Sequence, residues 1–206
     1  PGTLFAELIY RFTDEGALEM AYAATSDKPT PYNPTNHCYF ALDSAPDVSD
    51  TRLRIDSARY LETDAALIPT GKILPVAGTP YDFIREKPIG RDIAATPGGY
   101  DTCFLVRGTG MRTAARAYSR ASGIVLEVST DMPAIQLYTA NTLGERHGKD
   151  NKAYGRRSAF CLETEFCPDA VHHPAFPSGI VRPGERFTSR TVYAFSRQVA
   201  ASSATV

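Results

Sequence analysis

Two short segments carry side chains suited to proton transfer, one a histidine and the other an aspartate. The run from 33 to 40, Asn-Pro-Thr-Asn-His-Cys-Tyr-Phe, places His37 at the entrance of an expected strand. Histidine is the side chain best suited to proton transfer near neutral pH. Asp101 follows the turn sequence Gly98-Gly99-Tyr100 and opens an apolar strand. Taken alone, a histidine bonded to a nearby loop and an aspartate that accepts backbone hydrogen bonds are the simpler interpretations.

A third segment, residues 160–166, carries two carboxylates on an otherwise apolar strand. Because side chains alternate along a strand, Glu163 and Glu165 share one face with Cys161 and Cys167. If this face lines a cleft, burial and mutual repulsion would raise the pKa of at least one carboxyl group. A solvated sheet face is an equally good interpretation of the pattern alone.

The sequence gives little support for a metal or an organic cofactor. Cys161, Cys167, His172 and His173 could be assembled into a zinc site, but their spacing fits no common ligand pattern. The adjacent histidines would also point apart in an extended chain. The nucleotide-binding glycine motifs and the serine-hydrolase elbow are missing from the sequence. We therefore expect no metal and no cofactor.

Composition narrows the class of partner. The formal net charge is −1, the isoelectric point is about 6.5, and no basic stripe or polybasic run is present, so nucleic acid is a poor candidate. No apolar segment approaches the roughly 18 residues of a membrane span, and no signal peptide is visible. Four cysteines are too few for a disulfide framework, so we expect reduced thiols and a cytoplasmic protein.

The elements that must position these side chains are strands. Residues 4–12 and 18–24 alternate apolar and polar around Asp14-Glu15-Gly16, which predicts a hairpin. No convincing helical stripe of ten residues occurs, so the fold class is all-β and antiparallel. Two loops are expected, 63–100 because it is rich in proline and glycine, and 144–157 as a mobile, charged surface excursion. Residues 197–206 should form a tail. Further strands are expected at 37–42, 52–62, 102–107, 112–119, 123–130, 134–139, 158–166 and 186–195.

Several ordered motifs resemble those of the aldose 1-epimerases (galactose mutarotases). The resemblance runs from about residue 10 to residue 195. It rests on Asn-Pro-Thr-Asn-His-Cys-Tyr-Phe at 33–40, Ile-Pro-Thr-Gly at 68–71, Gly-Thr-Pro-Tyr-Asp-Phe at 78–83, Gly-Tyr-Asp at 99–101, Gln-Leu-Tyr-Thr-Ala-Asn at 136–141 and Cys-Leu-Glu-Thr at 161–164.

This resemblance implies a large antiparallel β-sandwich, the galactose mutarotase-like supersandwich, whose concave face holds a monosaccharide such as galactose or glucose. It implies that Glu163 is the general base and His37 the general acid for opening and reclosing the sugar ring. Asp101 and Gln136 would orient sugar hydroxyls, and no cofactor would be needed. The reaction would interconvert the α and β anomers of free hexoses.

Two departures from the family carry expectations of their own. Glu165 stands where the family usually has glutamine, so we expect its charge to raise the pKa of Glu163 and move the pH optimum upward. Members are also longer, so we expect residues 1–206 to be the C-terminal portion of a single domain, incomplete at its N-terminus. The missing portion should be needed for stability and full activity, since open sheet edges invite pairing or aggregation.

Three other functions remain open at this point. A non-catalytic sugar-binding relative would keep the fold without turnover. A glycoside hydrolase would use Asp101 and Glu163 as a carboxylate pair, and it would not need His37 at the ring oxygen. A sugar-phosphate epimerase would need arginines at the cleft, for which the candidates are Arg112, Arg116, Arg156 and Arg157.

Overall fold

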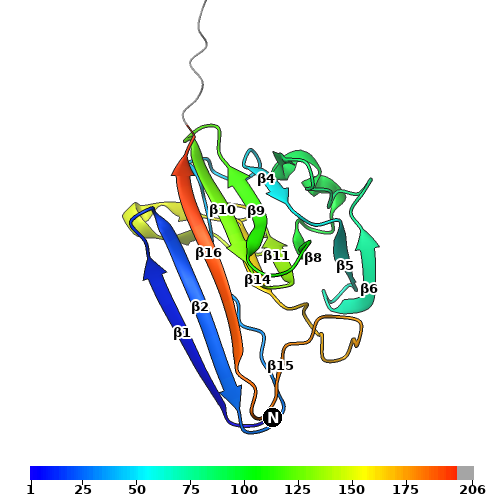
Figure 1. Ribbon diagram of the computed structural model, residues 1–206. Helices are drawn as coiled ribbons and strands as arrows, with labels where there is room; N and C mark the ends of the chain where they lie inside the picture. The colour runs from blue at the N-terminus through cyan, green and yellow to red at the C-terminus, as the bar shows by residue number, and fades with distance from the viewer. Residues whose placement is uncertain (199–206) are drawn as a thin grey trace, which may run out of the picture.

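Two antiparallel sheets form the computed structural model, which describes residues 1–198 apart from the side chain of Asp150 (Figure 1). Arg197, the first residue of the expected tail 197–206, is the last residue of β16, and residues 199–206 lie outside the described part. In order, the seven-stranded sheet contains β1 (Leu4–Phe12), β2 (Ala17–Ser26), β16 (Phe187–Arg197), β10 (Ile124–Thr130), β9 (Arg112–Tyr118), β4 (Arg52–Ile55) and β7 (Lys87–Pro88).

The second sheet is smaller and carries the residues of interest. Its five strands, in order, are β14 (Cys161–Glu165), β11 (Ala134–Tyr138), β8 (Asp101–Leu105), β5 (Arg59–Thr63) and β6 (Pro69–Pro75). Two short ribbons complete the strands, β3 (Thr30–Pro31) with β15 (Ile180–Val181) and β12 (Arg146–His147) with β13 (Ala153–Tyr154). Three single-turn 3-10 helices are present, η1 (Ile89–Arg91), η2 (Ile93–Ala95) and η3 (Lys149–Asn151).

The main core lies between the two sheets. Apolar side chains that alternate along each strand meet there, including Leu126 and Val128 of β10 and Ile135, Leu137 and Leu162 of the smaller sheet. Removal of this apolar surface from water is the main stabilising term for such a sandwich. Since alternate residues on β11 and β14 face this core, the residues between them must face the opposite side.

The predicted terminal hairpin is confirmed. β1 pairs with β2 in antiparallel register, from Leu4 opposite Ser26 to Phe12 opposite Leu18. Gly16 lies in the turn with a φ of 79°, a conformation that glycine adopts without steric cost. The all-β fold class predicted from the period-two pattern is also confirmed.

Two strand predictions were wrong in detail. Residues 37–42 do not form a strand, and only Phe40 pairs, in an isolated bridge with Phe160. The side chain of Asn36 accepts a hydrogen bond from the amide of Cys38, a local turn that competes with strand pairing. The predicted strand 52–62 is two strands, because the chain passes from the larger to the smaller sheet at residues 56–58.

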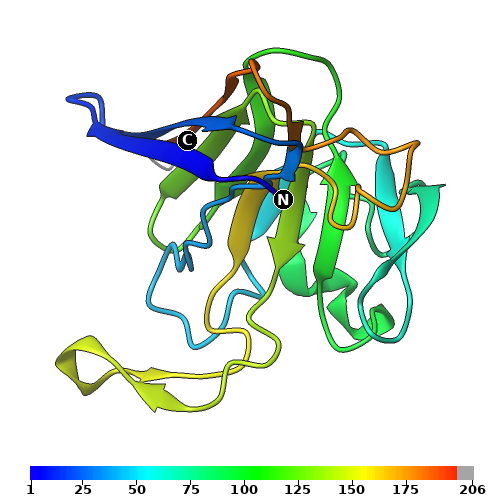
Figure 2. The ribbon, with the colours of Figure 1, turned by 90° about the horizontal axis from the view of Figure 1, so that it is seen from below.

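The loop predictions also need correction. Residues 63–100 contain β6, which lies at the edge of its sheet, where prolines are tolerated at strand ends. Residues 144–157 include the β12–β13 ribbon, which projects from the body of the molecule (Figure 2). Within residues 1–198, no helix has the length and hydropathy needed to cross a membrane.

Candidate active site

The register of the smaller sheet brings together three of the four predicted site residues. Gln136 of β11 lies directly opposite Glu163 of β14. On the other side of β11, Tyr138 lies opposite Asp101 of β8. Because residues opposite one another share a face, Asp101, Gln136 and Glu163 all project from the side of the sheet that faces away from the main core.

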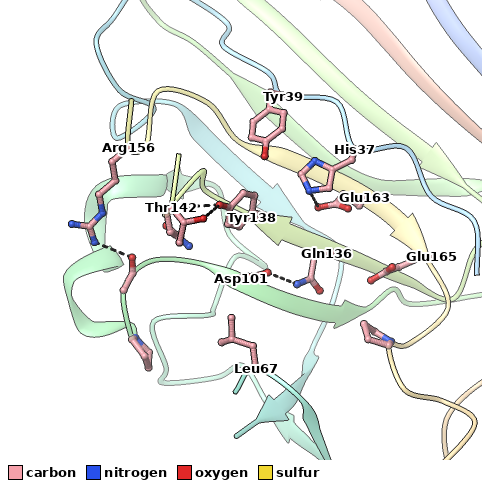
Figure 3. A pocket seen from close by; sticks show the side chains of 14 residues that line it. His37, Tyr39, Leu67, Asp101, Gln136, Tyr138, Thr142, Arg156, Glu163 and Glu165 are labelled. Carbon is pink, nitrogen blue, oxygen red and sulfur yellow. Dashed lines mark hydrogen bonds and ion pairs between the residues drawn. The ribbon is translucent and has the colours of Figure 1, made fainter. Parts of the chain in front are cut away.

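His37 comes from a different part of the chain. It lies on the loop between β3 and β4, which crosses this face near β14 (Figure 3). The four predicted residues line one cavity of about 730 Å³, a size typical of small-molecule sites. The other lining residues are Tyr39, Leu67, Pro97, Gly98, Tyr138, Asn141, Thr142, Arg156, Glu165 and Pro168.

An imidazole–carboxylate pair lies in this cavity. Nε2 of His37 is 3.4 Å from Oε1 of Glu163, and Nδ1 is 3.5 Å from Sγ of Cys161. Glu163 is only 7% exposed, whereas the His37 side chain is 49% exposed. Burial raises the pKa of Glu163, nearby His37 opposes that rise, and Asp101 adds to it. A carboxylate with a raised pKa beside a histidine is an arrangement suited to paired proton transfer.

A second pair, Asp101 and Gln136, lies beside the first. Nε2 of Gln136 donates a hydrogen bond of 2.7 Å to Oδ1 of Asp101, which fixes the orientation of the amide. Oε1 of Gln136 is then buried, and it has no hydrogen-bond partner among the described residues. A buried acceptor without a partner costs free energy.

Glu165 is a further carboxyl group in the cavity wall, and 9% of it is exposed. The solvated sheet face considered from the sequence is therefore wrong, since both glutamates of β14 are buried. Burial, followed by the charges of Glu163, Cys167 and Asp101, raises the pKa of Glu165 to about 8. The expected repulsion thus acts on Glu165, and the raised pKa of Glu163 comes first from burial.

Aromatic side chains form one wall, which the sequence interpretation had not assigned to the site. The ring centroid of His37 is 5.0 Å from that of Tyr39 and 5.9 Å from that of Tyr138. Tyr39 lies two residues after His37, and Tyr138 lies two residues after Gln136. On strand β11 this spacing places Tyr138 on the same face as Gln136. The spacing is the signal in the sequence that could have pointed to the two tyrosines.

The zinc set considered from the sequence is not brought together. His172 and His173 both contact Asp169, whereas Cys161 contacts His37. Among the described residues, the group that could hold a metal ion is His37, Cys161 and Glu163, whose ligand atoms lie within 4.8 Å of one another. In the present geometry, however, the two nitrogens of His37 face different partners, so the ring bridges Cys161 and Glu163.

The four cysteines are free thiols, as expected, with Cys103, Cys161 and Cys167 buried and Cys38 half-buried.

The arginines that a sugar-phosphate site would need are mostly elsewhere. Arg112 and Arg116 belong to β9 of the larger sheet, where they bind backbone carbonyls and Glu86 respectively. Of the four candidates, Arg156 lines the cavity, and its guanidinium group donates to the carbonyl of Gly98. A single arginine bound to a carbonyl is weak support for a phosphate subsite.

Together, the fold and the cavity define a β-sandwich protein with a buried acid–base pair on one sheet face. The family model described as aldose 1-epimerase matches residues 1–194, and the chain belongs to this family. Human galactose mutarotase is 39% identical over 201 residues, which are 95% of this chain and 58% of that protein. Aldose 1-epimerase from Escherichia coli K12 is 38% identical over 205 residues, covering 95% of this chain and 59% of the relative.

Solved structures agree with this assignment. An aldose epimerase homologue from C. elegans superimposes with a TM-score of 0.89 at 30% identity, over 97% of this chain and 62% of that one. Galactose 1-epimerase from Lactobacillus acidophilus gives a TM-score of 0.83 at 29% identity, over 97% and 59%. The chain thus spans about three-fifths of the length of the relatives it matches.

Proposed function

We propose that this chain is the C-terminal portion of a single aldose 1-epimerase domain that interconverts the α and β anomers of free hexoses, galactose and glucose among them. The observation that carries the proposal is the 3.4 Å approach of Nε2 of His37 to Oε1 of Glu163 inside a cavity of small-molecule size. The names of the human and bacterial relatives support the same reaction.

In the proposed reaction, Glu163 is the base and His37 the acid. Glu163 takes the proton from the anomeric hydroxyl group while His37, as imidazolium, gives its proton to the ring oxygen. The bond between C1 and the ring oxygen then breaks as C1 becomes an aldehyde. After rotation about the C1–C2 bond, His37 removes the proton from the former ring oxygen, which closes on the other face of C1. Glu163 returns its proton to the oxygen on C1, so both groups are regenerated.

The remaining wall residues would hold the sugar in place. Asp101 and Gln136 are hydrogen-bonded to one another and line the cavity beside the acid–base pair, which supports a role in holding sugar hydroxyls. The rings of Tyr39 and Tyr138 offer an apolar surface for the C–H face of a pyranose. The separate glycosidase hypothesis is less well supported, because His37, and not a second carboxyl group, lies closest to Glu163.

We also propose that segments outside this chain complete the cleft and cover part of its surface. The relatives are longer than this chain, and β1 presents exposed apolar side chains that include Phe5, Ile9 and Phe12. Exposed apolar patches of this kind commonly mark surfaces that another segment or protein covers. The four free thiols support a reducing compartment such as the cytoplasm for the protein.

Polarimetry tests the function. Freshly dissolved α-D-galactose and α-D-glucose should reach equilibrium rotation faster with this chain than in buffer. Glu163→Gln and His37→Asn should each reduce the acceleration by roughly 10²–10⁴-fold, as expected for loss of a positioned base or acid. Glu127→Gln, an exposed glutamate on β10, is the matched control and should retain the activity. Saturable sugar binding without any acceleration, in this chain and again after the segments outside it are restored, would instead identify a non-catalytic binding protein.

A further inference from the structure

Glu165 is an unusual group for a cavity wall, because nothing in the structure compensates a charge on it. Only 9% of the residue is exposed, and its carboxyl group lines the same cavity as Glu163. Among residues 1–198, no lysine, arginine or histidine forms an ion pair with it, and no side chain or amide donates a hydrogen bond to its carboxylate. Burial of an ionised carboxylate without a partner is costly, so the neutral acid is the favoured form.

The groups around Glu165 also disfavour a charge. Glu163 lies two residues away on the same face of β14, Asp101 and Cys103 come from β8, and Cys167 follows β14. Carboxyl and thiol groups are either neutral or negatively charged, so none of these groups stabilises a negative charge on Glu165. The imidazole of His37 is directed at Glu163.

A neutral carboxylic acid differs from a carboxylate in what it can bind. It carries one O–H donor in addition to its acceptor oxygens, whereas the carboxylate only accepts. In Figure 3 the carboxyl group of Glu165 extends toward the side of Gln136. Gln136 lies on the neighbouring strand β11 and lines the same cavity. Among the described residues no group forms a hydrogen bond with the carboxyl group of Glu165, so its O–H is available to a ligand in the cavity.

We propose that Glu165 is a substrate-binding residue that keeps its proton and donates it in a hydrogen bond to a sugar hydroxyl group held in the cavity. A sugar hydroxyl group can accept this hydrogen bond and still donate one of its own. The inference rests on the proposed function for the identity of the ligand as a sugar. It assigns Glu165 to binding and leaves the acid–base chemistry with His37 and Glu163.

The hydrogen bond from Glu165 to the sugar should be lost when Glu165 ionises. Burial and the neighbouring acidic groups raise the pKa of this carboxyl group to about 8, so the proton is held at neutral pH and lost at alkaline pH. Above that pH the donor disappears and a negative charge faces the sugar. Galactose binding should therefore weaken between pH 6 and pH 9 in the wild-type chain, through Kd and KM more than through kcat.

Equilibrium binding of galactose, measured by ligand-observed NMR at pH 6 and pH 9, tests the proposal. We expect the wild-type Kd to rise about 5- to 10-fold at pH 9, the loss expected for a buried hydrogen bond. Glu165→Gln keeps a donor that cannot ionise, so its Kd should be similar at both pH values. Glu165→Ala should bind about 5- to 10-fold more weakly than wild type at pH 6. Glu127→Gln is the control and should follow wild type.

The outcomes separate this proposal from the proposed function. The proposed hydrogen bond is wrong if galactose binding by Glu165→Gln weakens at pH 9 as much as binding by wild type. It is also wrong if Glu165→Ala binds galactose as tightly as wild type at pH 6. Neither result bears on catalysis, which polarimetry at pH 6 tests through Glu163. Circular dichroism confirms that each variant is folded, and Glu165→Gln, which removes a buried ionisable group, keeps the test available if Glu165→Ala does not fold.

Discussion

His37 and Glu163 owe their closeness to segments that are far apart in the chain. The loop between β3 and β4 brings the imidazole across β14, and the thiol of Cys161 lies 3.5 Å from its Nδ1. Nε2 is then left facing the carboxylate at 3.4 Å. Burial makes Glu163 a stronger base than an exposed glutamate, which matches the task of deprotonating a hydroxyl group.

The raised pKa of Glu163 predicts an acidic limit to activity. The base must be ionised, so kcat/KM should fall as the pH drops through a pKa above the ordinary glutamate value of 4.5. Asp101 contributes to this rise, so Asp101→Asn should move the acidic limb to lower pH as well as weaken sugar binding. A pH–rate profile of both proteins measures this. An acidic limb that stays in place or moves upward in the variant would refute the assignment.

Glu165 predicts a pH dependence of folding stability. The folded chain holds this proton up to about pH 8, whereas the unfolded chain releases it near 4.5. The wild-type protein therefore loses stability as the pH rises through this window. Glu165→Gln should gain roughly 2–4 kcal/mol over wild type between pH 5 and pH 8, as measured by urea unfolding. Equal stability differences at the two pH values would show that Glu165 is ionised in the folded chain.

At the scale of elements, the start of β8 is what places Asp101. Asn141, which follows β11, donates from Nδ2 to the carbonyl of Tyr100 and accepts from the hydroxyl of Thr139 through Oδ1. Gly99 lies against this network with a φ of 124°. A side chain there would place its Cβ 1.9 Å from Oδ1 of Asn141, so the turn depends on glycine.

Two adjacent glycines allow a matched test of that turn. Gly98 also has a positive φ of 84°, but a Cβ at this position meets nothing within 4 Å. Gly98→Ala should therefore cost only the strain of the backbone, about 1–2 kcal/mol. Gly99→Ala should cost about 2–4 kcal/mol, because the Asn141 hydrogen bonds are lost as well, and it should raise KM. Thermal unfolding and kinetics measure both effects, and equal costs would contradict the role of Asn141.

The strands were predictable where alternation is strong and pairing is local. The β1–β2 hairpin and the two faces of β14 follow directly from the spacing of apolar residues. The change of sheet at residues 56–58 was not predictable, because it is set by pairing with strands far along the chain, β9 for β4 and β8 for β5. β6 was missed because proline and glycine are tolerated on an edge strand.

For the site, the sequence pointed to the residue types but not to their surroundings. His37, Asp101, Gln136 and Glu163 were predicted largely through their resemblance to a family, and their shared cavity appears only with the fold. The burial of Glu165 could not be predicted, because alternation gives its face and not what covers that face.

At the scale of the whole molecule, β1 presents an apolar surface. Leu8 and Tyr10 lie opposite the buried residues Tyr22 and Met20 of β2, and so belong to the same face as part of the core. They are nonetheless exposed, as is Phe12, at 76%. The outer edge of β1 is also unpaired among the described residues. An exposed apolar edge strand is a site for association with another chain or segment.

This surface predicts that the chain associates at high concentration. Leu8→Lys combined with Phe12→Lys should shift sedimentation velocity profiles toward the monomer, because charges on an edge strand oppose pairing. Thr25→Lys combined with Thr188→Lys, at two exposed polar positions, controls for the added charge. If both double variants associate as the wild-type chain does, β1 is not the associating surface.

The central claim, that Glu163 acts as the base of a sugar mutarotase, is tested most directly by NMR exchange spectroscopy on galactose at anomeric equilibrium. One sample reports both binding, through line broadening, and interconversion, through cross-peaks between the α and β anomeric signals. We expect the wild-type chain to produce exchange cross-peaks that buffer alone lacks, and Glu163→Gln to bind galactose without producing them. Cross-peaks of equal intensity in the two proteins, or binding without exchange both in the wild-type chain and in the longer protein that restores the segments outside it, would contradict the claim.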